Sequence, residues 1–345
     1  MKTQKAFRVA LVSTDSLRGK EIKAALSDLK FPINNLELFD PDVQEEYCKL
    51  TQFEDIPRVI HHLEPELLEG LDLVFLAADA KTGRECGAFA LRKKMRAVDL
   101  SGAFSGDPKV PVPVAGVNSD LVLRDRPYLV ANPHAVTIIL SHIFHLVIPR
   151  FGLSRAVAFV LQPVSAFDEA GIEELAGQSA SLLSSAAVRK KVFKEQIAFN
   201  LLSHTEAPDA DGFSPSERQI LSEIGRVFQR PEFPLSLSII QAPVFHTYAV
   251  MAYLELERET DIKALEDLFK SSPLFKVPAA GKSCPVTSLS VAGKDRIYLG
   301  QIKKEPVAPR SFWIWTVTDN LTFGSALNAV EIGRGLLAAA LKDRA

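Results

Sequence analysis

Cysteine is scarce in this chain, and the few that occur have no spacing typical of a metal site or a disulfide framework. They are Cys48, Cys86 and Cys284, three among 345 residues. We predict that each packs as a small apolar residue in a reducing, cytoplasmic protein. No metal site is expected, because even the adjacent His61 and His62 would point to opposite faces of a strand.

Long apolar runs and an excess of positive charge are also lacking. No run approaches the length of a membrane span, and the apolar run near the N-terminus is too short for a signal sequence. The formal net charge is -2 at pH 7, which leaves little to bind a phosphate backbone. We therefore expect neither a membrane nor a nucleic-acid partner. The chain is 47% hydrophobic and 24% charged, which is ordinary for a globular protein with room for two domains.

The first 130 or so residues alternate short apolar strands with helical segments. This alternation favours an α/β fold with a Rossmann-type parallel sheet, whose ligand would lie at the carboxyl ends of the strands. The strands are predicted at Phe7–Ser13, Leu36–Phe39, Leu71–Ala77, Arg96–Leu100 and Tyr128–Ala131, and the helices at Gly19–Leu29 and Lys81–Lys94.

Beyond residue 150 the pattern changes to longer strands with few helices between them. It predicts an α+β domain with an antiparallel or mixed sheet. The extended segments are Arg155–Val164, Ser236–Ala242, Thr247–Leu256, Val286–Val291, Arg296–Ile302 and Phe312–Thr318. The helices are Gly171–Ser185, Ser214–Arg230 and Ser325–Leu341.

Six motifs occur in the order and spacing of one enzyme family. They are VALVSTDSLRG (9–19), VDLSGAF (98–104), VPVAGVN (112–118), ANPHAVT (131–137), LQPVSAFDEAGIEEL (161–175) and DNLTFGSALNAVEI (319–332). Together they resemble the aspartate-semialdehyde dehydrogenases across nearly the whole chain. The resemblance implies a dinucleotide-binding domain of residues 1–133 with 325–345, an α+β dimerisation domain of residues 134–324, and a homodimer.

The same resemblance places the family's catalytic positions, and most of them have changed. In that family a cysteine thiolate attacks the aldehyde, hydride passes to NADP, and phosphate releases an acyl phosphate. The nucleophile position is Ala135, while the active-site glutamine is retained as Gln162. Gln241 replaces the substrate arginine and Tyr248 replaces the catalytic histidine. Losing the nucleophile, the arginine and the histidine together argues against the family reaction.

Two histidines are possible substitutes for the lost groups. His134 stands where the family has an asparagine, and His246 lies two residues before Tyr248. We expect His246 on the same face of a strand as Tyr248, since side chains alternate along a strand. Both histidines can also be read as purely structural.

The expected nucleotide loop is altered too. The three glycine positions of the family hold Ser13, Ser16 and Gly19. A serine Cβ narrows the approach of a pyrophosphate, whereas hydroxyl groups can still donate to it. The turn therefore has two possible interpretations: it binds NADP or NAD, or it binds no ligand. If a dinucleotide binds, the contacting residues would be Ser13, Thr14, Ser16, Leu17, Gly19 and Asn320.

These features predict a divergent, non-catalytic homologue that binds a ligand or a partner, such as an active paralogue joined through the shared dimer surface. One alternative is an NAD(P)-dependent oxidoreductase that transfers hydride without a covalent nucleophile, with Tyr248, His246 or His134 as the proton donor. Another is a purely structural protein whose former cleft is filled by side chains such as Phe167 and Phe245.

Overall fold

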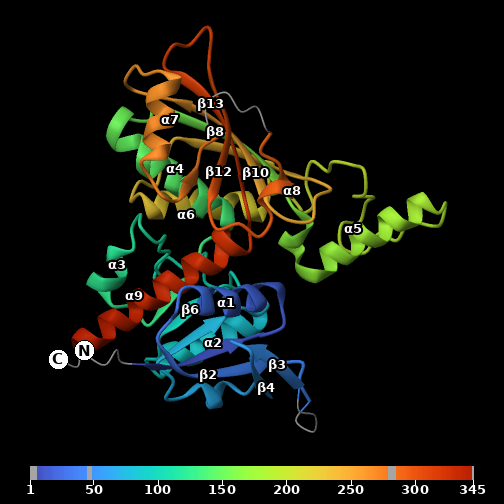
Figure 1. Ribbon diagram of the computed structural model, residues 1–345, viewed down its shortest axis with the longest axis vertical. Coiled ribbons are helices and arrows are strands. Elements are labelled where there is room, and N and C mark those ends of the chain that lie inside the picture. The colour runs from blue at the N-terminus through green and yellow to red at the C-terminus, as the bar shows by residue number, and fades with distance from the viewer. Residues whose placement is uncertain (1–5, 45–48, 279–284, 344–345) are drawn as a thin grey trace. The chain divides into compact units, whose positions relative to one another are not determined.

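The structure is a computed structural model that describes residues 6–44, 49–278 and 285–343 (Figure 1). It comprises two compact units, one of Met1–His134 with Ser325–Ala345 and one of Ala135–Gly324. We call them unit 1 and unit 2. Within the described ranges, no helix has both the length and the apolar character that crossing a membrane requires.

A seven-stranded sheet forms the centre of unit 1, with the strand order β3-β4-β2-β1-β5-β6-β7. Six neighbouring strands are parallel, which confirms the predicted Rossmann-type arrangement. These are β4 (Ile56–His62), β2 (Ile33–Asp40), β1 (Phe7–Val12), β5 (Leu73–Leu76), β6 (Ala97–Asp99) and β7 (Leu129–Ala131). Their carboxyl ends therefore meet at one edge of the sheet, where ligands bind in such folds.

Helices cover this sheet and complete its core. They are α1 (Leu17–Asp28), α2 (Ala80–Arg92), the short α3 (Asp120–Asp125) and α9 (Asn328–Asp343), with a short 3-10 turn at Pro65–Leu68. Residues of α1 and α9 pack against apolar side chains of β1 and β5 in one core cluster. Gly333 lets α9 approach closely, because a Cβ there would lie 2.8 Å from the ring of Phe75. The end of the chain is thus part of the core of unit 1.

The three cysteines can be judged only at Cys86, because Cys48 and Cys284 lie outside the described residues. Cys86 is buried on α2. Burial raises the pKa of its thiol to about 12, so the reactive thiolate is disfavoured. Cys86 is therefore a small apolar residue, as predicted.

An antiparallel hairpin at the edge of the unit 1 sheet was not predicted from the sequence. It consists of β3 (Lys49–Phe53) and β4 (Ile56–His62), and β4 pairs with β2. The two connecting residues, Glu54 and Asp55, both have positive φ, at 50° and 61°. That is the backbone of a two-residue hairpin turn which normally favours Asn-Gly.

Unit 2 is built on a six-stranded mixed sheet with the order β11-β12-β13-β10-β8-β9. Its central pairs are antiparallel, whereas β8–β9 and β11–β12 are parallel. The mixed sheet, one of the two predicted options, is therefore confirmed. The strands are β8 (Arg155–Gln162), β9 (Leu235–Gln241), β10 (Tyr248–Glu255), β11 (Phe275–Lys276), β12 (Ile297–Lys304) and β13 (Ser311–Thr318).

The two faces of this sheet differ in how they are covered. On β10, Val250, Ala252 and Leu254 are buried, while Met251 and Tyr253 on the other face are half-buried. The helices of unit 2 are α4 (Ala135–Phe151), α5 (Asp168–Leu183), α6 (Pro215–Val227), α7 (Ile262–Lys270) and α8 (Ser288–Val291). In Figure 1, α5 projects away from the sheet.

One sequence prediction in unit 2 was wrong, because Val286–Val291 is not a strand. Its second half forms α8 instead. The Thr287 side chain accepts from the backbone N–H of Ser290, and the Ser290 side chain accepts from the N–H of Thr287. This reciprocal cap stabilises a helical turn despite the β-branched residues around it.

Candidate functional site

Ala135 is the first residue of α4 in unit 2. Its methyl group offers no chemistry, although a helix N-terminus favours a negative charge. The surroundings are tight, because a Cβ added to Gly324 would lie 2.9 Å from the Ala135 Cβ. The family resemblance assigns a nucleophile to this position. Within unit 2, Ala135 instead packs against Gly324.

Three of the predicted site residues do lie together, and they bind one another. The Tyr248 hydroxyl donates to Gln162 Oε1 at 3.1 Å. Gln162 Nε2 donates to Gln241 Oε1 at 3.0 Å. Gln241 Nε2 donates to the backbone oxygens of Gln162 and Ala242, at 3.0 and 3.1 Å. We call Tyr248, Gln162 and Gln241 the buried network, because all three are buried.

The buried network carries no charge. Burial raises the pKa of Tyr248 above its usual value, so the phenol stays protonated and donates to Gln162. A carboxamide neither titrates nor supplies a cation. The network thus contains neither a base near neutral pH nor a partner for a carboxylate or phosphate.

The two candidate histidines occupy different settings. His134 closes unit 1 directly before Ala135, and burial lowers its pKa to about 4. The expectation that His246 shares a strand face with Tyr248 was wrong, because β10 begins only at Tyr248. Thr247 between them has a φ of 76°, which interrupts the extended backbone on which alternation depends.

Asn320 is held within unit 2. Its Oδ1 accepts from the backbone N–H of Thr247 at 3.0 Å, and its Nδ2 donates to Ser165 Oγ at 3.1 Å. The remaining predicted nucleotide contacts, Ser13–Gly19, belong to unit 1.

The turn between β1 and α1 is where the family resemblance places a nucleotide loop. Ser13 has a φ of 60°, the left-handed region in which glycine is favoured. Ser16 caps α1 by accepting from the N–H of Gly19 at 3.1 Å. Gly19 itself is required, because a Cβ there would lie 2.2 Å from the Ser13 backbone oxygen. Thr14 is buried, and its hydroxyl lies 3.2 Å from the Phe39 oxygen.

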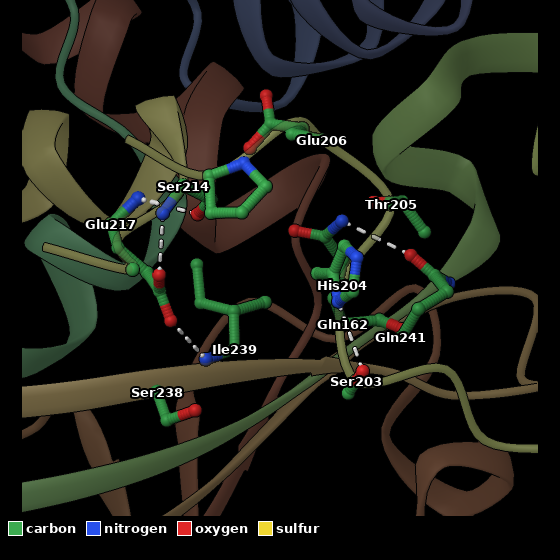
Figure 2. Close-up of a pocket in the computed structure, with 12 residues that line it drawn as sticks. Gln162, Ser203, His204, Thr205, Glu206, Ser214, Glu217, Ser238, Ile239 and Gln241 are labelled. Carbon is green, nitrogen blue, oxygen red and sulfur yellow. Dashed lines mark hydrogen bonds between the residues drawn. The ribbon is translucent and has the colours of Figure 1, made fainter. Parts of the chain in front are cut away.

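A cavity of about 120 Å³ opens beside the buried network in unit 2. Figure 2 shows Gln162 and Gln241 on one side of it and Glu217 and Glu206 on the other. Its charged lining consists of these two carboxylates, with no lysine or arginine among the described residues that line it. Phe245 is 44% exposed and Phe167 packs against Phe193, and neither ring lines this cavity. The alternative that such side chains fill the former cleft stays a prediction.

Sequence reasoning missed the acidic side of this cavity. Glu217 Oε1 accepts from the N–H of Ile239 at 2.9 Å, and its Oε2 accepts from the N–H of Ser214 at 2.8 Å. Glu206 Oε2 accepts from the N–H of Ser216 at 3.1 Å. The Ser-Pro-Ser-Glu helix start was the available signal, but it indicated a cap and not a cavity. Among the described residues, no group of three or more histidine, cysteine or acidic side chains could hold a metal ion.

Comparison with known proteins identifies relatives along the whole chain. The family profile described as the dimerisation domain of semialdehyde dehydrogenase matches residues 147–323. An aspartate-semialdehyde dehydrogenase from Aquifex aeolicus is 26% identical over 335 residues, covering 96% of this chain and 98% of the relative. A Pseudomonas aeruginosa protein named USG-1 protein homolog is 28% identical over 333 residues, with the same coverage.

A solved structure shows the same fold. It is the crystal structure of aspartate semialdehyde dehydrogenase II complexed with ASA from Vibrio cholerae. Its TM-score is 0.90 at 22% identity, and the match covers 97% of this chain and 99% of that chain. The predicted fold class is therefore confirmed, and the family profile confirms the resemblance.

Proposed function

Since the chain belongs to the semialdehyde dehydrogenase family through its dimerisation domain, we propose that it is a non-catalytic homologue in that family's reaction and acts by binding a ligand or a partner. The buried network carries this proposal. Where the resemblance places an arginine and a histidine, Gln241 and Tyr248 bond to each other through Gln162. The groups that would bind and deprotonate a substrate are replaced by neutral groups that satisfy one another.

The cavity charge supports the same conclusion. The family substrates are an aldehyde carrying a carboxylate, and phosphate. Anions of this kind need cationic or bidentate donors. The cavity beside the network has Glu206 and Glu217 as its charged lining, so a carboxylate or phosphate would meet charges of its own sign.

A partner is implied by the family of unit 2. The outer face of its sheet, the face that carries Met251, presents neighbouring apolar side chains. Met251 pairs with Phe159 and Trp315, and Tyr253 pairs with Trp313. We infer that a second copy of the chain covers this face in a homodimer. An active paralogue with a matching face is the alternative partner.

The direct test is an assay with aspartate semialdehyde, NADP and phosphate, in which the absorbance of NADPH measures turnover. We expect no turnover by the wild-type chain, with the Vibrio cholerae enzyme as positive control. We also expect none from Ala135→Cys, because a restored thiol would still lack a base and an anion clamp. Turnover by the wild-type chain at the rate of the control enzyme would refute the proposal.

An oxidoreductase with direct hydride transfer is the second candidate, and the retained β1–α1 turn is what favours it. The Tyr248 hydroxyl is a poor proton donor for it, because burial raises the pKa of that phenol. A screen of carbonyl substrates with NADH and NADPH tests this candidate. Reduction of any of these carbonyl substrates would support this candidate. The Ala135→Ser variant should keep that activity, because the mechanism uses no nucleophile at position 135.

A further inference from the structure

We propose that unit 1 selects NAD over NADP, and that the carboxylate of Asp40 makes this selection. The inference deepens the ligand-binding part of the proposed function and rests on it. It concerns residues of unit 1 alone. Neither the resemblance nor the relatives point to NAD, since the family reaction uses NADP.

The turn between β1 and α1 fits a dinucleotide. In a Rossmann-type fold the pyrophosphate lies where β1 ends and α1 begins, over a turn that allows the backbone to come close. Ser13 adopts the required left-handed conformation in spite of its Cβ. The Ser16 hydroxyl lies 2.8 Å from the Ser13 oxygen and 3.3 Å from the Ala77 oxygen. This hydroxyl is therefore directed into the turn, and Gly19 keeps helix and strand in close contact.

Asp40 stands where such folds read the adenosine ribose. It is the last residue of β2, the neighbour of β1, and it follows Gly19 by about 20 residues, the separation typical of a ribose-binding carboxylate. Asp40 is only 7% exposed. Among the described residues, its carboxylate accepts one hydrogen bond, from the N–H of Asp42 to Oδ1 at 3.1 Å. Oδ2 is thus left to accept from the 2′-hydroxyl of NAD.

The charges around Asp40 oppose a 2′-phosphate. Lys49 Nζ lies 2.7 Å from Asp15 Oδ2, and Lys23 Nζ lies 3.9 Å from Asp15 Oδ1. The hydrogen bond that Lys49 donates to Asp15 raises the pKa of Lys49, and the charges of Asp40 and Asp42 add to this effect. Lys49 is therefore attracted by three carboxylates, and both lysines already pair with Asp15.

A 2′-phosphate would bring about two more negative charges to this place. Lys23 is engaged further, since it donates to Thr51 Oγ1 at 2.7 Å. NADP would consequently meet carboxylates at a place where Lys23 and Lys49 are already paired with Asp15, whereas the 2′-hydroxyl of NAD would donate to Asp40.

The test is calorimetric titration of the full wild-type chain with NAD and with NADP. We expect saturable NAD binding that is at least about tenfold tighter than NADP binding. Raising the salt from about 0.05 to about 0.5 M should lower the NAD-to-NADP affinity ratio, because salt screens the repulsion between the 2′-phosphate and the carboxylates. Absent NAD binding, or NADP binding as tight as NAD, would overturn the inference.

Two variants then assign the effect to Asp40. Asp40→Asn keeps the size of the side chain and should reduce the NAD-to-NADP affinity ratio by about tenfold. Glu69→Gln is the matched control, because it also removes one carboxylate charge, here from an exposed ion pair with Lys93. Glu69 precedes β5, so it lies near the amino ends of the parallel strands, whereas Asp40 lies at their carboxyl ends. It should leave the ratio unchanged. An unaltered ratio in a folded Asp40→Asn would show that Asp40 is not the selecting residue.

These outcomes are separable from the proposed lack of catalysis. A chain that binds neither dinucleotide refutes the NAD inference but still agrees with absent turnover. A chain that turns over aspartate semialdehyde with NADP refutes the lack of catalysis, whereas the NAD preference is refuted only if NADP binds as tightly as NAD.

Discussion

At the scale of single residues, the candidate site of unit 2 holds three buried polar side chains that satisfy one another. Tyr248 and Gln241 each have a polar partner in Gln162. A buried polar group costs free energy unless it is hydrogen-bonded. We therefore expect the stability contributed by each of the three side chains to depend on the other two.

We expect Tyr248→Phe to lower the free energy of unfolding by about 1–3 kcal/mol, because Gln162 Oε1 would lose its donor while staying buried. Urea unfolding followed by circular dichroism measures this. Tyr128→Phe is the control, since Tyr128 is partly exposed, and it should change stability little. Equal stability of wild type and Tyr248→Phe would contradict the buried network.

His142 should make stability depend on pH. Its ring lies 5.5 Å from that of Phe323. Burial, with a smaller effect from His145, lowers the pKa of His142 from 6.5 to about 4. The unfolded chain then takes up a proton at a higher pH than the folded chain. The stabilisation is present above pH 6.5 and is lost as the pH falls toward 4.

For His142 we expect the free energy of unfolding to fall by about 2 kcal/mol between pH 7 and pH 5. Urea unfolding at a series of pH values should show a shallower slope for His142→Gln than for wild type. His145→Gln, at an exposed position on the same helix, should keep the wild-type slope. The assignment fails if both variants behave alike.

At the scale of elements, the sequence predicted those helices and strands whose residues favour the backbone conformation that they adopt. Helix α6 is an example, because the helix was predicted to begin at Ser214, and Ser214 and Glu217 form a capping box there. The β3–β4 hairpin was missed because Glu54 and Asp55 adopt a turn that their side chains do not favour. Pairing of β4 with β2 holds that turn in place.

Ser214→Ala should destabilise unit 2 by about 1 kcal/mol, because the N–H of Glu217 would lose its acceptor. Thermal or urea unfolding measures the effect. Ser216→Ala, in the same turn but outside the cap, is the matched control. A larger loss from Ser216→Ala than from Ser214→Ala would contradict the assigned cap.

At the scale of the whole molecule, the partly exposed sheet face of unit 2, the face that carries Phe159 and Met251, is the feature that an assembly would explain. Phe159 on this face is 44% exposed and lies opposite Met251 on the neighbouring strand. Exposed apolar side chains gathered on one face are typical of protein interfaces. The family of unit 2, named for dimerisation, points to the same use.

We expect the chain to elute as a homodimer in size-exclusion chromatography with light scattering. Phe159→Glu should weaken the dimer by at least about a hundredfold, since a charge would be buried in an apolar interface. Val307→Glu, at a residue that is 88% exposed between β12 and β13, should leave the dimer intact. A dimer that survives Phe159→Glu would place the interface elsewhere.

The sequence by itself determined the fold class and the family, because apolar periodicity and the order of motifs are properties of the chain. The loss of the catalytic residues stays a prediction. It could not reveal that Gln162 bonds to Gln241 and Tyr248, since Gln162 is 79 and 86 residues away from them along the chain. Only the tertiary structure decided this, by pairing β8 with β9 and with β10. It also decided that His246 lies off the strand, because the φ of Thr247 is 76°. The carboxylates around Lys49 likewise meet only when β1, β2 and β3 join one sheet.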